Sequence, residues 1–232
     1  MKGLFITGTD TEIGKTTVAT SLASLLRHKG VDVGVMKPFA TGTKVFSNKY
    51  RSKDSALLAN AAQVNDSDRQ INPFFYSIPT APFTAAKIKE QRGPSLEVAL
   101  RTYQKLFAKH GFMIVEGIGG VMVPLTKKES VVHFAKLLDL PTIIVAGAKT
   151  GTINHTLLTV KICKDFGLNL VGVIINGMSP RESLLKKETI NTIRELSKVR
   201  ILSVIPHMKR RDLKNIRYIL EIGLNANKIL AF

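Results

Sequence analysis

The sequence predicts an α/β fold in which helices cover both faces of a mostly parallel sheet. Short runs rich in β-branched residues alternate along the chain with segments of helical periodicity, and this alternation is typical of parallel sheets. The first apolar run continues into a polar loop that contains glycine, and then into a helical pattern. In open parallel sheets ligands bind at the carboxyl ends of the strands, so we expect the functional residues there.

The expected elements follow one another without a repeat or a Ser/Gly linker, so residues 1–232 are expected to form a single domain. Strands are expected near residues 2–7, 32–37, 112–116, 142–147, 170–175 and 200–204. Helices are expected near residues 15–29, 54–62, 94–109, 130–138, 153–166 and 183–197. The proline-containing stretches 38–53 and 64–82 are expected to be loops. The amphipathic segment 213–220 fits a packed C-terminal helix or, alternatively, a membrane-binding tail.

Composition indicates a globular cytoplasmic protein. No apolar run approaches the roughly 20 residues that a membrane-spanning helix needs. Cys163 is the only cysteine, which fits a reducing compartment, and its apolar neighbours indicate a buried thiol. The net charge of +17 would attract polyanions. However, no aromatic residues accompany the basic cluster at 209–211, so we do not expect dedicated nucleic-acid binding.

The first strand leads into a candidate phosphate-binding loop. The order strand, polar glycine loop, Gly-Lys-Thr and helix is the context that such a loop requires. Its backbone N–H groups and the helix N-terminus favour a bound anion. The strict spacing asks for glycine at position 9, where this chain has Thr9 after Gly8. The alternative is an ordinary strand-to-helix turn. The loop residues that we expect at a nucleotide are Glu12, Ile13, Gly14, Lys15, Thr16 and Thr17.

Three further charged residues are candidates for the site, two of them at strand ends. Lys37 closes the second expected strand, and Pro38 restricts it to an extended conformation; the alternative is a surface lysine. Asp54 opens a helix and would otherwise serve only as a first-turn acid. Glu116 ends a buried strand and precedes Gly117, Ile118 and Gly119, whose glycines allow backbone to approach a ligand closely. Thr16, Asp54 and Glu116 would supply the hard oxygen ligands that Mg²⁺ prefers.

Later segments offer weaker indications. Gly151, Thr152 and Asn154 precede a helix whose N-terminus could receive a carboxylate, or else Thr152 or Asn154 simply caps it. Two strand ends could frame a nucleobase or form only turns. They carry Asn176 and Gly177, and Pro206, His207 and Met208.

Taken together, these motifs resemble those of the dethiobiotin synthetases, ATP-dependent enzymes of biotin synthesis. The matching segments are 8–16, 37–38, 41–42, Asp54, 116–120, 123–125 and 151–156. They occur in the same order across essentially the whole chain. The resemblance therefore implies a P-loop NTPase-like three-layer fold.

The resemblance also implies a reaction and residue roles. CO₂ adds to an amine of 7,8-diaminononanoate, ATP phosphorylates the resulting carbamate, and the second amine closes the ring to give dethiobiotin. Lys15 and Lys37 would stabilise carbamate and phosphoryl charge, while Thr11 and Thr41 would contact the diamine. The implied Mg²⁺ ligands are Thr16, Asp54 and Glu116, and the implied adenine contacts are Asn176 and 206–208. The implied state is a homodimer in which residues 151–154 of the neighbouring subunit take the substrate's tail carboxylate.

A partitioning or positioning ATPase that binds DNA or membrane is the alternative on the same fold. Such proteins resemble one another in a lysine five positions before Lys15, where this chain carries Asp10. Their usual aspartate is replaced here by Glu116. Within the resemblance, Ile118 stands where an alanine is usual, and Phe83 follows Pro82 in place of a histidine.

Overall fold

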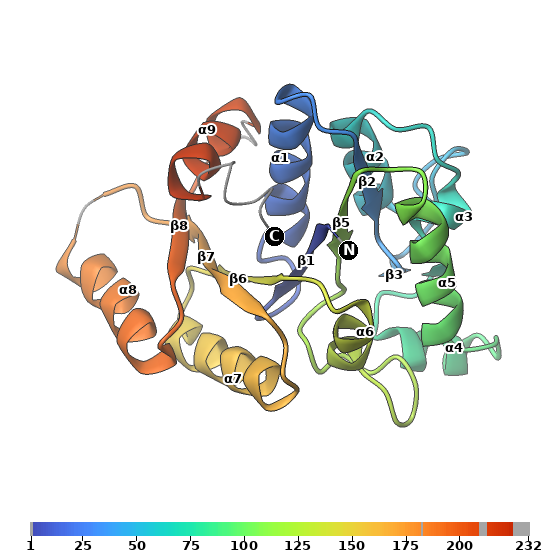
Figure 1. Cartoon of the computed structure of the whole chain (residues 1–232). Coiled ribbons are helices and arrows are strands. Elements are labelled where there is room, and N and C mark those ends of the chain that lie inside the picture. The colour runs from blue at the N-terminus through green and yellow to red at the C-terminus, as the bar shows by residue number, and fades with distance from the viewer. Residues whose placement is uncertain (1, 182, 209–212, 225–232) are drawn as a thin grey trace.

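The computed structural model describes residues 2–181, 183–208 and 213–224. Six parallel strands form the central sheet in the order β2-β5-β1-β6-β7-β8, with helices on both sides (Figure 1). The strands are β1 (Gly3–Gly8), β2 (Val33–Met36), β5 (Phe112–Glu116), β6 (Thr142–Gly147), β7 (Leu170–Met178) and β8 (Ile201–Pro206). Each expected strand is present, and the predicted fold class is confirmed.

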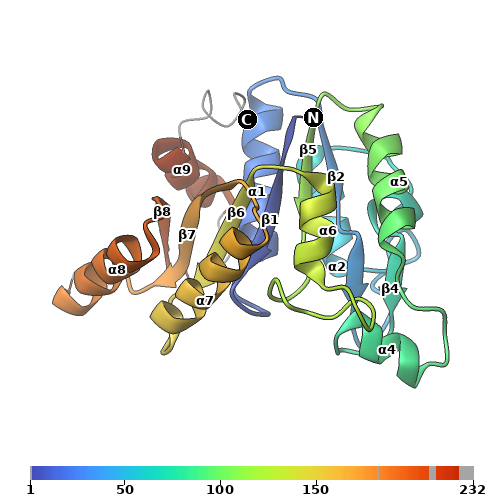
Figure 2. The same ribbon diagram turned by 60° about the horizontal axis from the view of Figure 1, so that its bottom comes forward.

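The helices divide between the two faces because alternate residues of a strand point to opposite sides. Leu4 and Ile6 of β1 belong to the core beneath α1, α2 and α9. Phe5 belongs to the core on the other face, beneath α5 and α6, and α7 and α8 cover the β6–β8 end of that face. Figure 2 shows α6, α7 and α8 together in front of the sheet. The bounds are α1 (Lys15–His28), α2 (Lys53–Ala62), α5 (Leu96–Phe107), α6 (Val131–Leu138), α7 (Thr152–Asp165), α8 (Leu184–Ser197) and α9 (Leu213–Leu224).

The two stretches predicted as loops contain short regular elements, so that prediction was wrong in part. These elements are β3 (Phe39–Thr41), α3 (Asp68–Ile71) and β4 (Phe74–Tyr76), and a further short helix, α4 (Pro82–Ile88), begins at the last residue of the second stretch. β3 and β4 pair in parallel as a separate two-stranded sheet. Strands of three residues are too short to show a period, and Pro82 begins α4, where its missing N–H costs no hydrogen bond.

The C-terminal amphipathic segment forms α9, which packs on α1. Ile216 and Leu220 are buried, so the packed-helix interpretation is confirmed. The basic cluster at 209–211 lies outside the described residues. Cys163 is fully buried, and this burial raises the pKa of its thiol to about 12. None of the helices in the described part of the chain is long and apolar enough to span a bilayer.

Candidate active site

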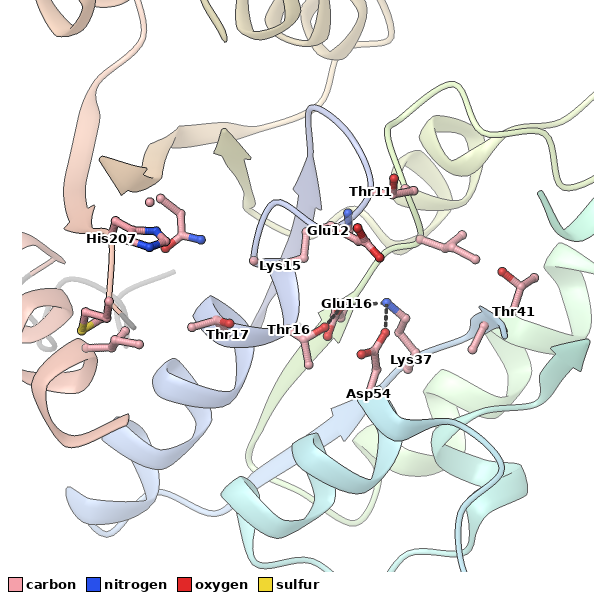
Figure 3. A pocket seen from close by; sticks show the side chains of 18 of the residues that line it. Thr11, Glu12, Lys15, Thr16, Thr17, Lys37, Thr41, Asp54, Glu116 and His207 are labelled. Atoms are coloured by element: carbon pink, nitrogen blue, oxygen red, sulfur yellow. Dashed lines mark hydrogen bonds and ion pairs between the residues drawn. The ribbon is translucent and has the colours of Figure 1, made fainter. Parts of the chain in front are cut away.

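A pocket of about 620 Å³ opens at the carboxyl ends of the central strands. It is bordered by the loop between β1 and α1, by the ends of β2, β5, β7 and β8, and by the start of α2 (Figure 3). Most of the residues singled out from the sequence line it. They are Thr11, Glu12, Gly14, Lys15, Thr16, Thr17, Lys37, Thr41, Asp54, Glu116, Ile118, Gly119, Asn176, Gly177, Pro206, His207 and Met208.

A few expected site residues do not line this pocket. Ile13 is buried in the core, and Gly117 contributes its carbonyl to the neighbouring charge cluster. The segment 151–154 lies apart, at the start of α7. There Gly151 is the N-cap and no side chain caps the helix, so the capping alternative for Thr152 and Asn154 was wrong.

The phosphate-loop segment is held in shape by glycine conformation and one distant side chain. Gly14 has φ 96°, and a Cβ there would come within 2.1 Å of the Asn176 side-chain nitrogen. That nitrogen donates to the Ile13 carbonyl at 2.8 Å. Only glycine fits between the two. Asn176 therefore supports the loop besides lining the pocket.

Lys15 lies folded back within the loop. Its side-chain amine donates to the Asp10 carbonyl at 2.5 Å, and the residue is only 6% exposed. Burial, and then the positive charge of Lys37, lower the pKa of Lys15 to about 8. The Asp10 carboxylate forms an ion pair with Lys149 at 2.7 Å, and this contact lowers the pKa of Asp10.

A charge cluster formed by Thr16, Lys37, Asp54 and Glu116 lies beside the loop, with Lys37 and Glu116 buried and Asp54 partly exposed (Figure 3). The Lys37 Nζ donates to Glu116 Oε1 at 2.7 Å and pairs with Asp54 Oδ2 at 3.1 Å. It also donates to the Gly117 carbonyl at 2.8 Å. The Thr16 hydroxyl donates to the same Glu116 oxygen at 2.7 Å. Lys37 is 3% exposed and Glu116 is fully buried, so Lys37 is no surface lysine.

The ionisation of the cluster follows from burial and mutual attraction. Burial disfavours the charge on Lys37, but Glu116 and Asp54 outweigh it and raise the pKa of Lys37. The Lys37 charge, opposed by burial, lowers the pKa of Asp54. Glu116 is so deeply buried that desolvation raises its pKa despite Lys37. Lys37 therefore remains an ammonium, while burial works against the negative charge on Glu116.

The cluster fits a hard metal ion. Glu116 Oε2 is buried and has no hydrogen-bond partner in the structure, and an unpartnered buried oxygen costs free energy unless a ligand satisfies it. Two carboxylates and a hydroxyl are the ligand types that Mg²⁺ takes alongside water and phosphate. In the described ranges no group of three or more His, Cys, Asp or Glu side chains could hold a metal.

Sequence reasoning missed two residues that line the pocket, Ala40 and Ile216. Ala40 belongs to the unexpected strand β3. Ile216 comes from α9, whose amphipathic pattern predicted a helix. No local sequence pattern indicated which end of the sheet that helix would cover.

The fold and the pocket define the chain as a P-loop NTPase: a glycine loop joins the central strand to its helix on a parallel sheet. A family model described as an AAA domain matches residues 2–215. A ParA family ATPase from Chlorobium tepidum superposes with a TM-score of 0.53 over 99% of this chain and 93% of its own, at 17% identity. That likeness shows the fold alone.

Sequence relatives are more specific. An ATP-dependent dethiobiotin synthetase from Bacillus licheniformis is 39% identical over 99% of this chain and 96% of its own length. One from Nitrosopumilus maritimus is 36% identical over 99% of this chain and all of its own. The chain therefore belongs to the ATP-dependent dethiobiotin synthetase family, which confirms the resemblance seen in the sequence.

Proposed function

We propose that this protein closes the ureido ring of dethiobiotin. It would use ATP, CO₂ and 7,8-diaminononanoate and release ADP and phosphate. Family membership supports the reaction. The observation that carries the assignment within the pocket is the buried ammonium of Lys37, paired with Asp54 and Glu116 next to the phosphate loop.

The presence of two buried lysines in the pocket supports an anionic acceptor for the γ-phosphoryl group. Lys15 and Lys37 lie close enough for the charge of Lys37 to lower the pKa of Lys15. Phosphate transfer to neutral water would not call for a second ammonium on the acceptor side. A carbamate is an anion that must approach the negatively charged γ-phosphate, and two ammonium groups reduce that repulsion. At an effective dielectric of about 20, one such contact at 4 Å is worth roughly 4 kcal/mol before desolvation.

Catalysis would rest on positioning and electrostatics, with no covalent enzyme intermediate. Lys37 would stabilise the carbamate as its oxygen attacks the γ-phosphorus, and Lys15 would stabilise charge on the transferred phosphoryl group. Thr11 and Thr41, which line the same pocket, would orient the diamine. The second amine would then attack the carbonyl carbon, and phosphate would leave with the carbamate oxygen.

We propose Thr16, Asp54 and Glu116 as the residues that hold Mg²⁺. The unpartnered oxygen of Glu116 supports this assignment. When bound, the ion would neutralise phosphate charge. Glu12, Gly14, Thr17, Ile118 and Gly119, which line the pocket, would surround the phosphates and sugar, while Ile13 and Gly117 would contribute only their backbone. At the other end of the pocket, Asn176, Gly177, Pro206, His207 and Met208 would hold the adenine.

A homodimer would complete the substrate site. The segment 151–154 lies outside the pocket, and the start of α7 has no side-chain cap. Thr152 is 8% exposed, and its hydroxyl has no partner in the structure. We propose that this helix N-terminus of a neighbouring copy receives the tail carboxylate.

The lone buried cysteine, Cys163, supports a cytoplasmic location.

The test is phosphate release from Mg·ATP with and without diaminononanoate and bicarbonate. We expect release to require both compounds, and dethiobiotin to appear in equal amount. Parallel reactions contain DNA or anionic vesicles in place of the diamine. Release that ignores the diamine and responds to DNA or vesicles would overturn the proposal in favour of a positioning ATPase.

A further inference from the structure

The backbone of Lys37 is hydrogen-bonded to a turn that is distant in sequence. The Lys37 N–H donates to the Ile71 carbonyl at 2.8 Å. The Lys37 carbonyl accepts from the Asn72 side-chain nitrogen at 2.6 Å. Pro38 follows and has no N–H to donate, so β2 ends here. Both main-chain polar groups of Lys37 are thus held by residues 71–72.

Asn72 is fully buried, and only the donor group of its side-chain amide makes hydrogen bonds. The Nδ2 group donates to two carbonyls, those of Lys37 and Phe74 at 2.6 and 3.1 Å. The Oδ1 atom is buried without a partner. The opposite amide orientation would set an oxygen against both carbonyls, so the surroundings fix the donor. An unsatisfied buried acceptor is costly, which indicates that the donor side has a use that offsets it.

The same turn also holds the segment that carries Asp54. The Asn72 carbonyl accepts from the Arg51 guanidinium. The Arg51 side chain and backbone N–H both donate to the Asp68 carboxylate, the backbone contact at 3.1 Å. Arg51 lies three residues before Asp54 in the chain. Both members of the Lys37–Asp54 ion pair are therefore anchored to residues 68–72.

We propose that Asn72 is a positioning residue: its amide fixes the end of β2 so that the Lys37 ammonium meets Asp54, Glu116 and the reacting groups in one geometry. The inference rests on the proposed function for its kinetic consequence, but its structural part does not. Asn72 lies outside the set of residues that line the pocket. It would act only through Lys37.

The central variant is Asn72→Ala, which leaves the Lys37 and Phe74 carbonyls without their donor. Asn72→Ser is the conservative variant, since its hydroxyl can restore one hydrogen bond. Ile193→Ala is the control for lost stability, because Ile193 is fully buried in α8, at the far edge of the molecule from α3 (Figure 1).

Two measurements separate positioning from simple destabilisation. The first is kcat for dethiobiotin formation, alongside the ATP dissociation constant and the thermal midpoint. We expect Asn72→Ala to lower kcat by about tenfold or more, with ATP affinity within twofold, since a small displacement of a catalytic group is costly. Asn72→Ser should recover part of kcat, and Ile193→Ala should lose thermal stability without losing kcat.

The second measurement does not depend on the reaction. Lys37 is 3% exposed, so acetic anhydride should modify it slowly in the wild-type protein, as followed by mass spectrometry of the folded chain. We expect Asn72→Ala to speed acetylation of Lys37 several-fold and Ile193→Ala to leave it unchanged.

The two measurements distinguish failure of the positioning role from failure of the proposed function. An unchanged acetylation rate together with an unchanged kcat would overturn the positioning role. A wild-type protein that makes no dethiobiotin would overturn the proposed function. Faster Lys37 acetylation in Asn72→Ala would in that case still support the anchor.

Discussion

Two clusters of charged side chains lie at opposite ends of the same two strands, β2 and β5. At the carboxyl ends, Lys37 and Glu116 meet beside the phosphate loop. At the amino ends, Asp32 precedes β2 and His110 precedes β5, and they meet beside a cavity of about 360 Å³. The two clusters have similar components but differ in how completely their carboxylates are paired.

At the amino ends, the carboxylates of the cluster are all paired. His110 lies between two carboxylates, with Nδ1 at 3.2 Å from Asp32 and Nε2 at 2.9 Å from Asp66. The other Asp66 oxygen pairs with Lys109 at 3.2 Å. Every carboxylate oxygen of Asp32 and Asp66 has a partner. Such an arrangement ties loops together and leaves no oxygen of Asp32 or Asp66 for a ligand to satisfy. Its unpartnered group is instead a nitrogen, the buried Nε of Arg27, whose guanidinium lies 3.7 Å from Asp32.

The cluster at the carboxyl ends is incomplete. Glu116 keeps one buried oxygen unpartnered, and Lys15 is held where burial and Lys37 lower its pKa to about 8. A bound metal ion and phosphates would relieve both costs. The comparison teaches that a cluster of charges indicates a cation site when it leaves a buried carboxylate oxygen unsatisfied. The following predictions test that difference.

The largest effect is expected from Lys37→Ala. Removing one preorganised stabilising group typically lowers turnover by about 10²-fold or more, and ATP binding should remain largely intact. Lys37→Gln, which keeps a donor for Glu116, guards against a folding defect. Lys109→Ala in the amino-end cluster is the matched control and should keep kcat within about twofold, because surface ion pairs contribute little. Steady-state kinetics and ATP titrations provide the measurements; a Lys37→Ala enzyme with wild-type turnover would refute the role of Lys37.

Glu116→Gln should raise the Mg²⁺ concentration needed for half-maximal activity. A neutral amide is a weaker ligand, and changes around a metal site typically cost about 10–100-fold in metal affinity. Asp66→Asn is the control carboxylate change and should leave the Mg²⁺ requirement unaltered. The check is activity against free Mg²⁺ at saturating ATP. Equal Mg²⁺ curves for Glu116→Gln and wild type would mean that Glu116 serves only the fold.

ATP affinity should fall as pH rises above about 8. Lys15 has a lowered pKa in the free protein, so it loses its proton above that value, whereas ATP phosphates favour the charged form. ATP binding at pH 9 should therefore be accompanied by the uptake of at most about one proton. The ATP affinity should fall by at most ~10-fold per pH unit. Titration calorimetry in buffers of different ionisation enthalpy measures both. Lys15→Arg, which stays charged, should flatten the dependence; a wild-type affinity that is constant from pH 7 to 9.5 would contradict the assignment.

The smallest effect is expected from His110→Ala. This change removes one partner from the nearly buried Asp66, whose side chain is 7% exposed. A lost hydrogen bond of this kind costs about 1 kcal/mol, or roughly 2–4 °C in thermal midpoint for a chain of this size. Turnover of the folded enzyme should be unchanged. A large loss of activity without loss of stability would show that the amino-end cluster also has a functional part.

Most of the sheet and its pocket lining followed from the sequence because the signals are local. Buried parallel strands are apolar runs, and the step from β1 through Gly14 and Lys15 into α1 has a fixed order. Lys37 and Glu116 were found because each closes such a run. Parallel strands bring their carboxyl ends to one edge, which places these residues together.

Other features depend on contacts between distant segments, so no local pattern could reveal them. β3 and β4 are three residues each and exist by pairing with one another. The hydrogen bond from Asn72 to the Lys37 carbonyl joins residues 35 positions apart. Ile216 reaches the pocket only because α9 packs on α1. At α7, Gly151 with φ 85° is the N-cap, and neither Thr152 nor Asn154 caps the helix as the alternative interpretation had it.

The central claim is that a carbamate held by Lys37 attacks the γ-phosphate. Oxygen transfer tests it most directly: the enzyme turns over diaminononanoate and ATP with freshly dissolved ¹⁸O-labelled CO₂, and the phosphate is examined by mass spectrometry. The account predicts one labelled oxygen in each phosphate, because the carbamate oxygen bonded to phosphorus leaves with it when the ring closes. Unlabelled phosphate formed alongside labelled dethiobiotin would mean that ATP is split by water, and would contradict the account.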